Sequence, residues 1–204
     1  MPFELIPGAA LDDGALLAPL AKRFADPRPA RPFVFAWSSG CFTALERPGP
    51  ATLFLYELPW GVDRDVGWRA RLEFARMLAW RRISMPRARA AFWKMVTPRR
   101  DGTMGFERAS PELRRALLAQ RAPFVRSVLG LSRRDVRPRG DLEVHAAIGG
   151  ASSAAMERAL ARLSAVQPLA SRTTLDGLDH LAPLTHPERI ARWVCTTLTG
   201  RAPA

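Results

Sequence analysis

The sequence predicts an α/β fold built around a mainly parallel sheet in one domain. Short apolar runs bounded by Pro, Gly or small residues, which are typical of buried strands, alternate along the chain with longer stretches of helical periodicity. This alternation is the pattern of parallel sheets whose strands are joined by helices. The length of 204 residues, with 48% hydrophobic and 25% charged residues, fits one domain with a sizeable core.

Each element has its own signal in the sequence. Residues 11–24 predict a helix, because three leucines fall on one face behind two aspartates that suit a helix start. Residues 64–100 form a helical stretch rich in Arg and Trp, and Pro111 suits the first turn of a further helix. Strands are expected at 33–37, 52–57, 142–148 and 171–175, and further helices at 111–129, 153–166 and 187–198.

Composition restricts the compartment and the cofactors. No apolar stretch approaches the roughly 18 residues of a transmembrane helix, and the N-terminus lacks the positive charges and apolar run of a signal peptide. We therefore expect a cytoplasmic protein with no membrane partner. The two cysteines, Cys41 and Cys195, show no CxxC spacing, so free thiols are expected rather than a disulfide framework or a zinc site. No cofactor or metal is expected.

The net charge of +12 is typical of proteins that bind nucleic acid or anionic surfaces. However, Lys22 and Lys94 are the only lysines among 31 basic residues, and the chain is rich in Ala and Pro. Arg, Ala and Pro all have GC-rich codons, so the composition of the genome competes with a binding explanation. A nucleic-acid partner is therefore disfavoured.

Ser38 is the first candidate for chemistry. In Ala36-Trp37-Ser38-Ser39-Gly40, a serine lies between a predicted buried strand and a helix, with small residues where a sharp turn is crowded. This is the context of a nucleophile elbow, G-x-S-x-G, with Ala36 in place of the first glycine and the Ser39 N–H as an oxyanion donor. The alternative is that Ser38 is only a turn residue.

A serine nucleophile needs a base, which is most often histidine. His145 lies inside a predicted strand, where a buried structural role is expected, and His186 precedes Pro187 and is expected to help cap the last helix. His180 instead follows a short strand and precedes the C-terminal helix. This position places it in a loop at the carboxyl edge of a parallel sheet, and we take it as the candidate base.

Three segments, in order, resemble the α/β-hydrolase family. "PFVFAWSSGCFTALE" resembles its elbow, "ATLFLYELPWGVD" its sixth strand, and "DGLDHLAPLTHPERIARWV" the ending in which a histidine precedes a helix opened by proline. The resemblance spans about residues 32–198. It implies a reduced α/β-hydrolase core with a mainly parallel sheet of five or six strands, and Ser38 and His180 follow the family's chain order.

The resemblance leaves the acid of the triad open. The family usually has an acid after the seventh strand, where this chain reads "IGGASS" and has no carboxylate. Some relatives place the acid after the sixth strand, which here corresponds to Glu57, with Asp63 as a second choice. The alternative for Glu57 is a carboxylate that accepts backbone N–H groups at the start of a loop. Asp179 adjoins His180, but side chains of successive residues usually diverge, so Asp179 is a poor orienter.

The chain also has a shorter N-terminal half than the family. Only 32 residues precede Phe33, where relatives carry four strands and an oxyanion loop. In one interpretation "FELIPGAA" is the strand and loop that supply the second oxyanion donor, and Phe3–Ile6 borders the elbow strand. In the other, the chain is an N-terminal truncation. In the first case a homodimer along the open edge of that strand is expected.

Residues 64–138 are expected to form a helical cap, and residues 1–63 and 139–204 the hydrolase core. Trp68, Trp80 and Trp93 among arginines are also a pattern of single-strand nucleic-acid binders, but an amphipathic cap is favoured. The function implied is a serine esterase-type hydrolase of a small apolar acyl substrate. The alternative is a catalytically impaired or noncatalytic protein with a basic surface for an anionic partner.

Overall fold

The computed structural model describes residues 3–7, 11, 14–25, 32–49, 51–62, 65, 68–120, 136–137 and 139–200. Its centre is a five-stranded sheet in the order β1-β2-β3-β4-β5, and each adjacent pair is parallel. The parallel sheet predicted from the sequence is therefore confirmed. The strands are β1 (Phe3–Ile6), β2 (Phe33–Trp37), β3 (Ala51–Tyr56), β4 (Leu142–Gly149) and β5 (Ser171–Leu175).

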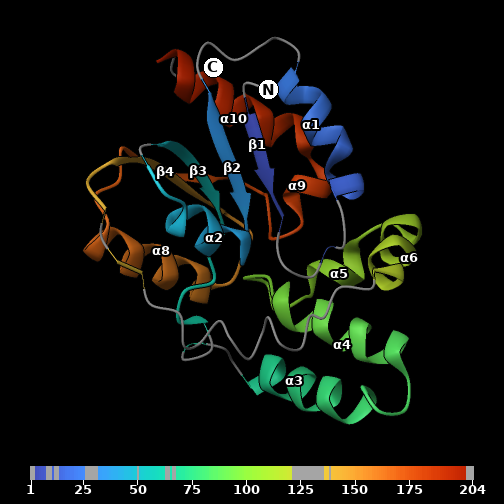
Figure 1. Cartoon of the computed structure of the whole chain (residues 1–204). Coiled ribbons are helices and arrows are strands. Elements are labelled where there is room, and N and C mark those ends of the chain that lie inside the picture. The colour runs from blue at the N-terminus through green and yellow to red at the C-terminus, as the bar shows by residue number, and fades with distance from the viewer. Residues whose placement is uncertain are drawn as a thin grey trace.

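Helices cover both faces of the sheet (Figure 1). A short 3₁₀ turn, η1, precedes α1, so the helix expected at 11–24 is split, and its two aspartates lie outside the described residues. One face carries α1, α9 and α10, and the other carries α2 and α8. Their bounds are η1 (Gly14–Leu17), α1 (Ala18–Ala25), α2 (Gly40–Glu46), α8 (Ala154–Val166), α9 (Ala182–Thr185) and α10 (Pro187–Thr199).

The elbow strand β2 is buried on both faces. Phe33, Phe35 and Trp37 belong to the hydrophobic cluster on the side of α1 and α10, whereas Val34 and Ala36 belong to the cluster on the side of α2 and α8. All five side chains are buried. This is why β2 is a continuous apolar run rather than an alternating one, as is usual for a parallel strand between two helical layers.

In the part of the chain that the structure describes, the insertion between β3 and β4 contains the helices α3 (Trp68–Trp80), α4 (Met85–Val96), α5 (Gly105–Arg108) and α6 (Pro111–Ala119). The helical stretch expected at 64–100 is thus two helices, separated by a turn at 81–84. Pro86 lies in the first turn of α4, where its missing N–H costs no hydrogen bond, whereas in the interior of one continuous helix it would remove a bond and clash with the preceding turn, which explains the break. The helix expected at 111–129 begins at Pro111 as predicted, and residues 121–129 lie outside the described residues.

The insertion lies beyond the carboxyl ends of the strands, toward which the arrowheads point in Figure 1. Its buried side chains, which include Met77, Phe92 and Phe106, form one cluster with Phe35 and Trp37 of β2. The Trp93 indole N–H also donates to the Leu117 carbonyl at 3.2 Å and ties α4 to α6. The insertion is therefore packed onto the core by shared apolar side chains.

The N-terminal strand borders the elbow strand. Phe3 pairs with Phe33 and Ile6 with Ala36 in the parallel β1–β2 register. The Phe24 ring of α1 lies 5.6 Å from Phe3 and 5.1 Å from Phe33, centroid to centroid, and fixes this corner. Within the described residues β1 is an edge strand, and a homodimer along this edge stays a prediction.

Over the residues described, none of the helices combines the length and apolar character that crossing a bilayer requires.

Candidate active site

Ser38 occupies a sharp turn between β2 and α2. Its φ is 57°, in the left-handed region that non-glycine residues rarely adopt. The turn is fixed from both sides: the Ser38 N–H donates to the Tyr56 carbonyl at 3.0 Å, and the Ser38 carbonyl accepts from the Cys41 N–H at 3.0 Å. A strained backbone that is held this firmly is characteristic of functional sites, where the strain costs about 1–3 kcal/mol.

Gly40 is required by the packing of the turn. A Cβ at this position would lie 2.4 Å from the Pro7 carbonyl oxygen and 2.5 Å from that of Ile6, both of which are backbone atoms. The start of α2 is therefore pressed against the end of β1. Ala36, which replaces the first glycine of the elbow pattern, is fully buried in β2 without an unusual φ, so the extra methyl group is accommodated.

Glu57 follows β3 as Ser38 follows β2, and the two residues share an unusual backbone. With φ 55°, Glu57 is the only described non-glycine residue besides Ser38 that has a positive φ. Its carboxylate is fully buried. Oε1 accepts from the Gly149 N–H at 2.9 Å and from the Ser152 hydroxyl, and Oε2 lies 2.8 Å from Nδ1 of His180. Glu57 thus contacts a backbone N–H with one carboxylate oxygen and a histidine with the other, and its role as the orienter of His180 stays a prediction.

His180 lies in the loop after β5, at the carboxyl edge of the sheet. Its side chain is buried, and its ring lies 5.6 Å from that of Trp37, the residue that precedes Ser38. The Tyr56 hydroxyl donates to the carbonyl of the preceding residue, Asp179, at 2.8 Å. Because Glu57 engages Nδ1, the nitrogen that can accept a proton from a nucleophile is Nε2.

Comparison with known proteins identifies the fold. No family model and no curated protein sequence matches the chain. An α/β hydrolase from Sphaerobacter thermophilus has a similar structure, with a TM-score of 0.57 and 20% sequence identity over 95% of this chain and 90% of that one. The chain has an α/β-hydrolase fold. The fold expected from the three sequence segments is therefore confirmed.

In this α/β-hydrolase fold the other carboxylates considered for the site have different surroundings. Oδ1 of Asp179 accepts from the Leu181 N–H at 3.0 Å, and Oδ2 pairs with Arg99. The observed partner of His180 is instead Glu57. Asp63, the second choice for the acid, lies outside the described residues.

The other two histidines of this chain, His145 and His186, lie away from the turn that carries Ser38. His145 is buried in β4, stacks on Phe54 with a centroid distance of 4.8 Å, and bonds through Nδ1 to the Ser171 hydroxyl at 2.8 Å, as a structural histidine does. His186 stands at the N-cap of α10, but only its carbonyl caps the helix. His186 therefore helps to cap the helix, as expected, through its backbone, while the imidazole Nδ1 lies 2.9 Å from the Thr185 hydroxyl.

Two groups that hold Glu57 could not be recognised from the sequence. Gly149 and Ser152 belong to "IGGASS", the segment after β4 in which the sequence shows no acid. A Cβ on Gly149 would lie 2.2 Å from the Leu178 carbonyl oxygen, so glycine also admits the histidine loop. The run of small residues was the one feature of this segment that the sequence showed.

Within the described ranges, no group of three or more His, Cys, Asp or Glu is arranged to hold a metal.

The thiol beside the elbow is expected to be unreactive. Cys41 is fully buried, with Sγ 3.3 Å from the Ala36 carbonyl oxygen, and burial raises the pKa of its thiol. In the native protein at pH 8, a thiol reagent should therefore modify at most the partly buried Cys195, whereas both thiols should react in guanidinium. Fast native reaction of two thiols would contradict the burial of Cys41.

The same burial predicts how stability depends on alkaline pH. The thiolate of Cys41 forms more readily in the unfolded chain than in the folded one, so its contribution is present below the unfolded pKa of about 8.5 and is lost as pH rises above it. The free energy of unfolding should begin to fall at about pH 8.5 and should keep falling as the pH rises further. The decline should be shallower in Cys41→Ala, which is measured by denaturant titration at each pH.

Proposed function

We propose that this protein is a serine hydrolase that transfers an acyl group from a small apolar ester-type substrate to water. Ser38 is the nucleophile, His180 is the general base, and Glu57 orients and stabilises the histidine. The observation that carries the proposal is the buried contact of 2.8 Å between Glu57 Oε2 and His180 Nδ1. This pair lies at the sheet edge on which Ser38 is held in a strained strand-to-helix turn.

The chemistry follows from these positions. Ser38 Oγ attacks the substrate carbonyl carbon while its proton passes to Nε2 of His180, and the carboxylate of Glu57 stabilises the imidazolium that forms. The imidazolium then gives this proton to the departing alkoxide, which leaves as an alcohol. Water, deprotonated by His180, attacks the acyl-enzyme, and collapse of the second tetrahedral intermediate returns the proton to Ser38 and releases the acid.

The negative oxygen of each tetrahedral intermediate needs hydrogen-bond donors. The Ser39 N–H is the first donor in this proposal, since it directly follows the nucleophile at the start of α2. The second donor is assigned to the segment after β1. Pro7 belongs to this segment and contacts the elbow at Gly40, and residues 8–10, which continue it, lie outside the described residues.

The insertion is assigned the role of a cap over the substrate site. It lies beyond the carboxyl ends of the strands, where an α/β fold carries its ligand. The side chains that it adds to the buried cluster beside Trp37 are apolar, among them Met77, Phe92 and Phe106. An apolar acyl group suits such surroundings better than a charged one.

Hydrolysis of a p-nitrophenyl ester series from acetate to octanoate tests the proposal. Wild-type protein should release p-nitrophenol with saturation kinetics and should prefer the short acyl chains. Rates equal to those in buffer for every ester would contradict a hydrolase. In that case, salt-sensitive retention of single-stranded DNA by the same preparation would favour a noncatalytic protein that uses its net charge of +12.

A further inference from the structure

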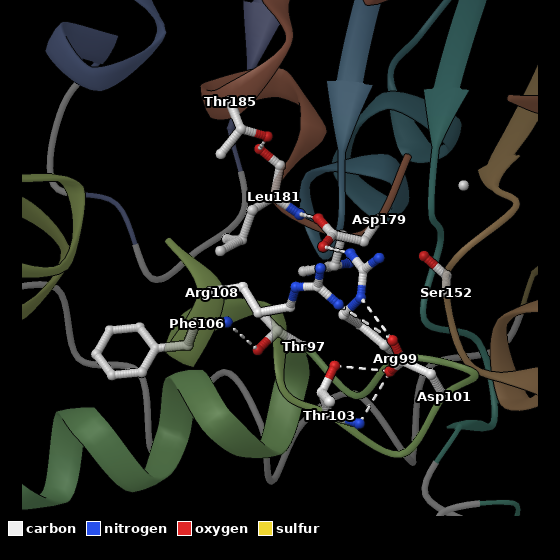
Figure 2. A network of polar contacts seen from close by, with 12 residues as sticks. Thr97, Arg99, Asp101, Thr103, Phe106, Arg108, Ser152, Asp179, Leu181 and Thr185 are labelled. Atoms are coloured by element: carbon white, nitrogen blue, oxygen red, sulfur yellow. Dashed lines mark hydrogen bonds and ion pairs between the residues drawn. The ribbon is translucent and has the colours of Figure 1, made fainter. Parts of the chain in front are cut away.

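We propose that Arg99 is a positioning residue, through which the helical insertion holds the His180 loop in its working geometry. This inference rests on the proposed hydrolase function. Arg99 lies in the turn between α4 and α5 and touches neither Ser38 nor the His180 ring among its described contacts. Its guanidinium instead pairs with the carboxylate of Asp179, the neighbour of His180, as Figure 2 shows.

The turn that carries Arg99 is firmly built. The Arg99 N–H donates to the Thr103 carbonyl at 2.9 Å, and the Gly105 N–H donates to the Thr97 carbonyl at 2.7 Å, which closes a short hairpin. The Thr97 hydroxyl donates to the Trp93 carbonyl at 2.6 Å and accepts from the Phe106 N–H at 3.0 Å. The hairpin is thus anchored at its base to both α4 and α5 (Figure 2).

The hairpin also forms hydrogen bonds with residues 151–153, the loop that supplies a hydrogen-bond donor to Glu57. The Arg100 N–H donates to the Ala151 carbonyl at 2.9 Å, and the Ser153 N–H donates to the Pro98 carbonyl at 3.2 Å, so the two segments pair as a short antiparallel bridge. Ser152, which is paired with Arg99 in this bridge, donates its hydroxyl to Glu57. One hairpin therefore contacts the supports of both members of the Glu57–His180 pair.

The side chain of Arg99 makes the contact between the hairpin and the loop that carries His180. The side chains of Arg99 and Asp179 are only 15% and 14% exposed, so their attraction is screened less than that of a surface pair. The other Asp179 carboxyl oxygen accepts from the Leu181 N–H at 3.0 Å, which braces the loop across His180. Loss of Arg99 would leave this carboxylate without its cation, and the loop free to shift.

Charge is the second consequence of losing Arg99. Among the described residues, the charged or titratable side chains around the His180 loop include Glu57, Tyr56, Asp179, Arg99 and Arg189. Asp101 faces Arg99 from its own hairpin, with Oδ2 3.8 Å from Nε. Burial, reinforced by the charges of Glu57 and Asp179, raises the pKa of Tyr56, so this phenol stays a neutral donor. Without Arg99, the uncompensated carboxylate of Asp179 would favour the protonated form of the neighbouring imidazole.

The test is steady-state kinetics of Arg99→Gln on the best p-nitrophenyl ester. We expect kcat to fall about 10- to 100-fold with KM changed less than about threefold, because the loop geometry rather than substrate binding is lost. The acid limb of the profile of kcat/KM against pH should move to higher pH. Arg99→Lys keeps the charge, so it should recover part of kcat and should return the acid limb to its wild-type pH. If Arg99→Gln fails to fold, the kinetics of Arg99→Lys are compared with those of the wild-type protein instead.

Matched variants separate positioning from general damage. Arg108 bonds to Asp101 at 3.2 Å in the same network without reaching Asp179, so Arg108→Gln should keep wild-type kinetics. In the double variant Arg99→Gln/Asp179→Asn, the acid limb should return to its wild-type pH, because position 179 no longer carries an uncompensated charge. Its kcat should stay low, because the Arg99–Asp179 ion pair is still missing. Wild-type kcat and pH profile in Arg99→Gln, or an equal loss of kcat in Arg108→Gln, would overturn the proposal.

A spectroscopic readout keeps this inference distinct from the hydrolase function. If wild-type protein hydrolyses no ester, the proposed hydrolase function is wrong. The ring signals of His180 in an NMR spectrum still report whether the Arg99–Asp179 ion pair, here called the tie, positions the His180 loop. They are assigned with His145→Gln and His186→Gln. A change of the His180 signals in Arg99→Gln, absent in Arg108→Gln, supports the tie. Unchanged His180 signals in Arg99→Gln overturn it.

Discussion

Replacing Ser38 by alanine should reduce ester hydrolysis by at least about 10³-fold, and by up to about 10⁶-fold if all measured turnover passes through this hydroxyl. The loss is this large because no acyl-enzyme can form, and water would have to attack the substrate directly. The measurement is kcat on the best p-nitrophenyl ester, with the melting temperature as a check on folding. The backbone of the turn should persist, since alanine has the same Cβ as serine and the Ser38 N–H still reaches the Tyr56 carbonyl.

Two further variants control this result. Ser164→Ala removes a hydroxyl from α8 that bonds only locally to the Leu160 carbonyl at 2.9 Å, and it should keep full activity. Ser38→Gly should be as inactive as Ser38→Ala but should melt no lower, because glycine adopts a φ of 57° without the cost of a Cβ, about 1 kcal/mol. Activity of Ser38→Ala within tenfold of wild type would rule out Ser38 as the nucleophile.

Replacing Glu57 by glutamine should lower kcat by about 10²- to 10⁴-fold. The Gly149 N–H and the Ser152 hydroxyl both donate to Oε1, so the amide oxygen of glutamine must take this place. The amide nitrogen would then face Nδ1 of His180 and donate to it, which moves the imidazole proton to Nε2. A histidine in that tautomer cannot accept the proton of Ser38. The loss should appear in kcat, with little change in KM.

Glu143→Gln is the matched control. Glu143 is a second carboxylate beside a histidine, with Oε1 3.3 Å from Nε2 of His145, and it lies on β4 away from the elbow. This substitution disturbs a carboxylate–histidine contact of similar kind and should leave kcat within about twofold of wild type. Equal losses of activity in Glu57→Gln and Glu143→Gln would show that the effect of Glu57 is general destabilisation rather than orientation of His180.

The strands and the elbow could be predicted because their signals are local. β2 and β5 were expected at the residues where they lie, since each is a short run closed by a turn. Ser38 stood out because small residues surround it between an apolar strand and a helix, and His180 because it follows a strand and precedes a helix opened by proline. Patterns of this kind are set by neighbours in the sequence, so one chain suffices to read them.

The supports of the site depend on contacts between distant segments, and these could not be read in advance. Arg99 and Asp179 are 80 residues apart, and Ser152 and Glu57 are 95 apart. In a chain with 31 basic residues, nothing in the sequence distinguishes Arg99 from the other arginines. The division of the Arg/Trp-rich stretch into α3 and α4 was missed for a different reason, since the apolar periodicity continues through a turn of only four residues.

Covalent labelling with a fluorophosphonate, followed by mass spectrometry of the tryptic peptides, tests the role of Ser38 most directly. The reagent phosphonylates only a serine whose hydroxyl is activated by a base, so it needs no knowledge of the substrate. The wild-type protein should gain one adduct, located at Ser38, and His180→Gln should label far more slowly. No adduct, an adduct at another residue, or undiminished labelling of Ser38→Ala would contradict the assignment of Ser38 as the nucleophile of a serine hydrolase.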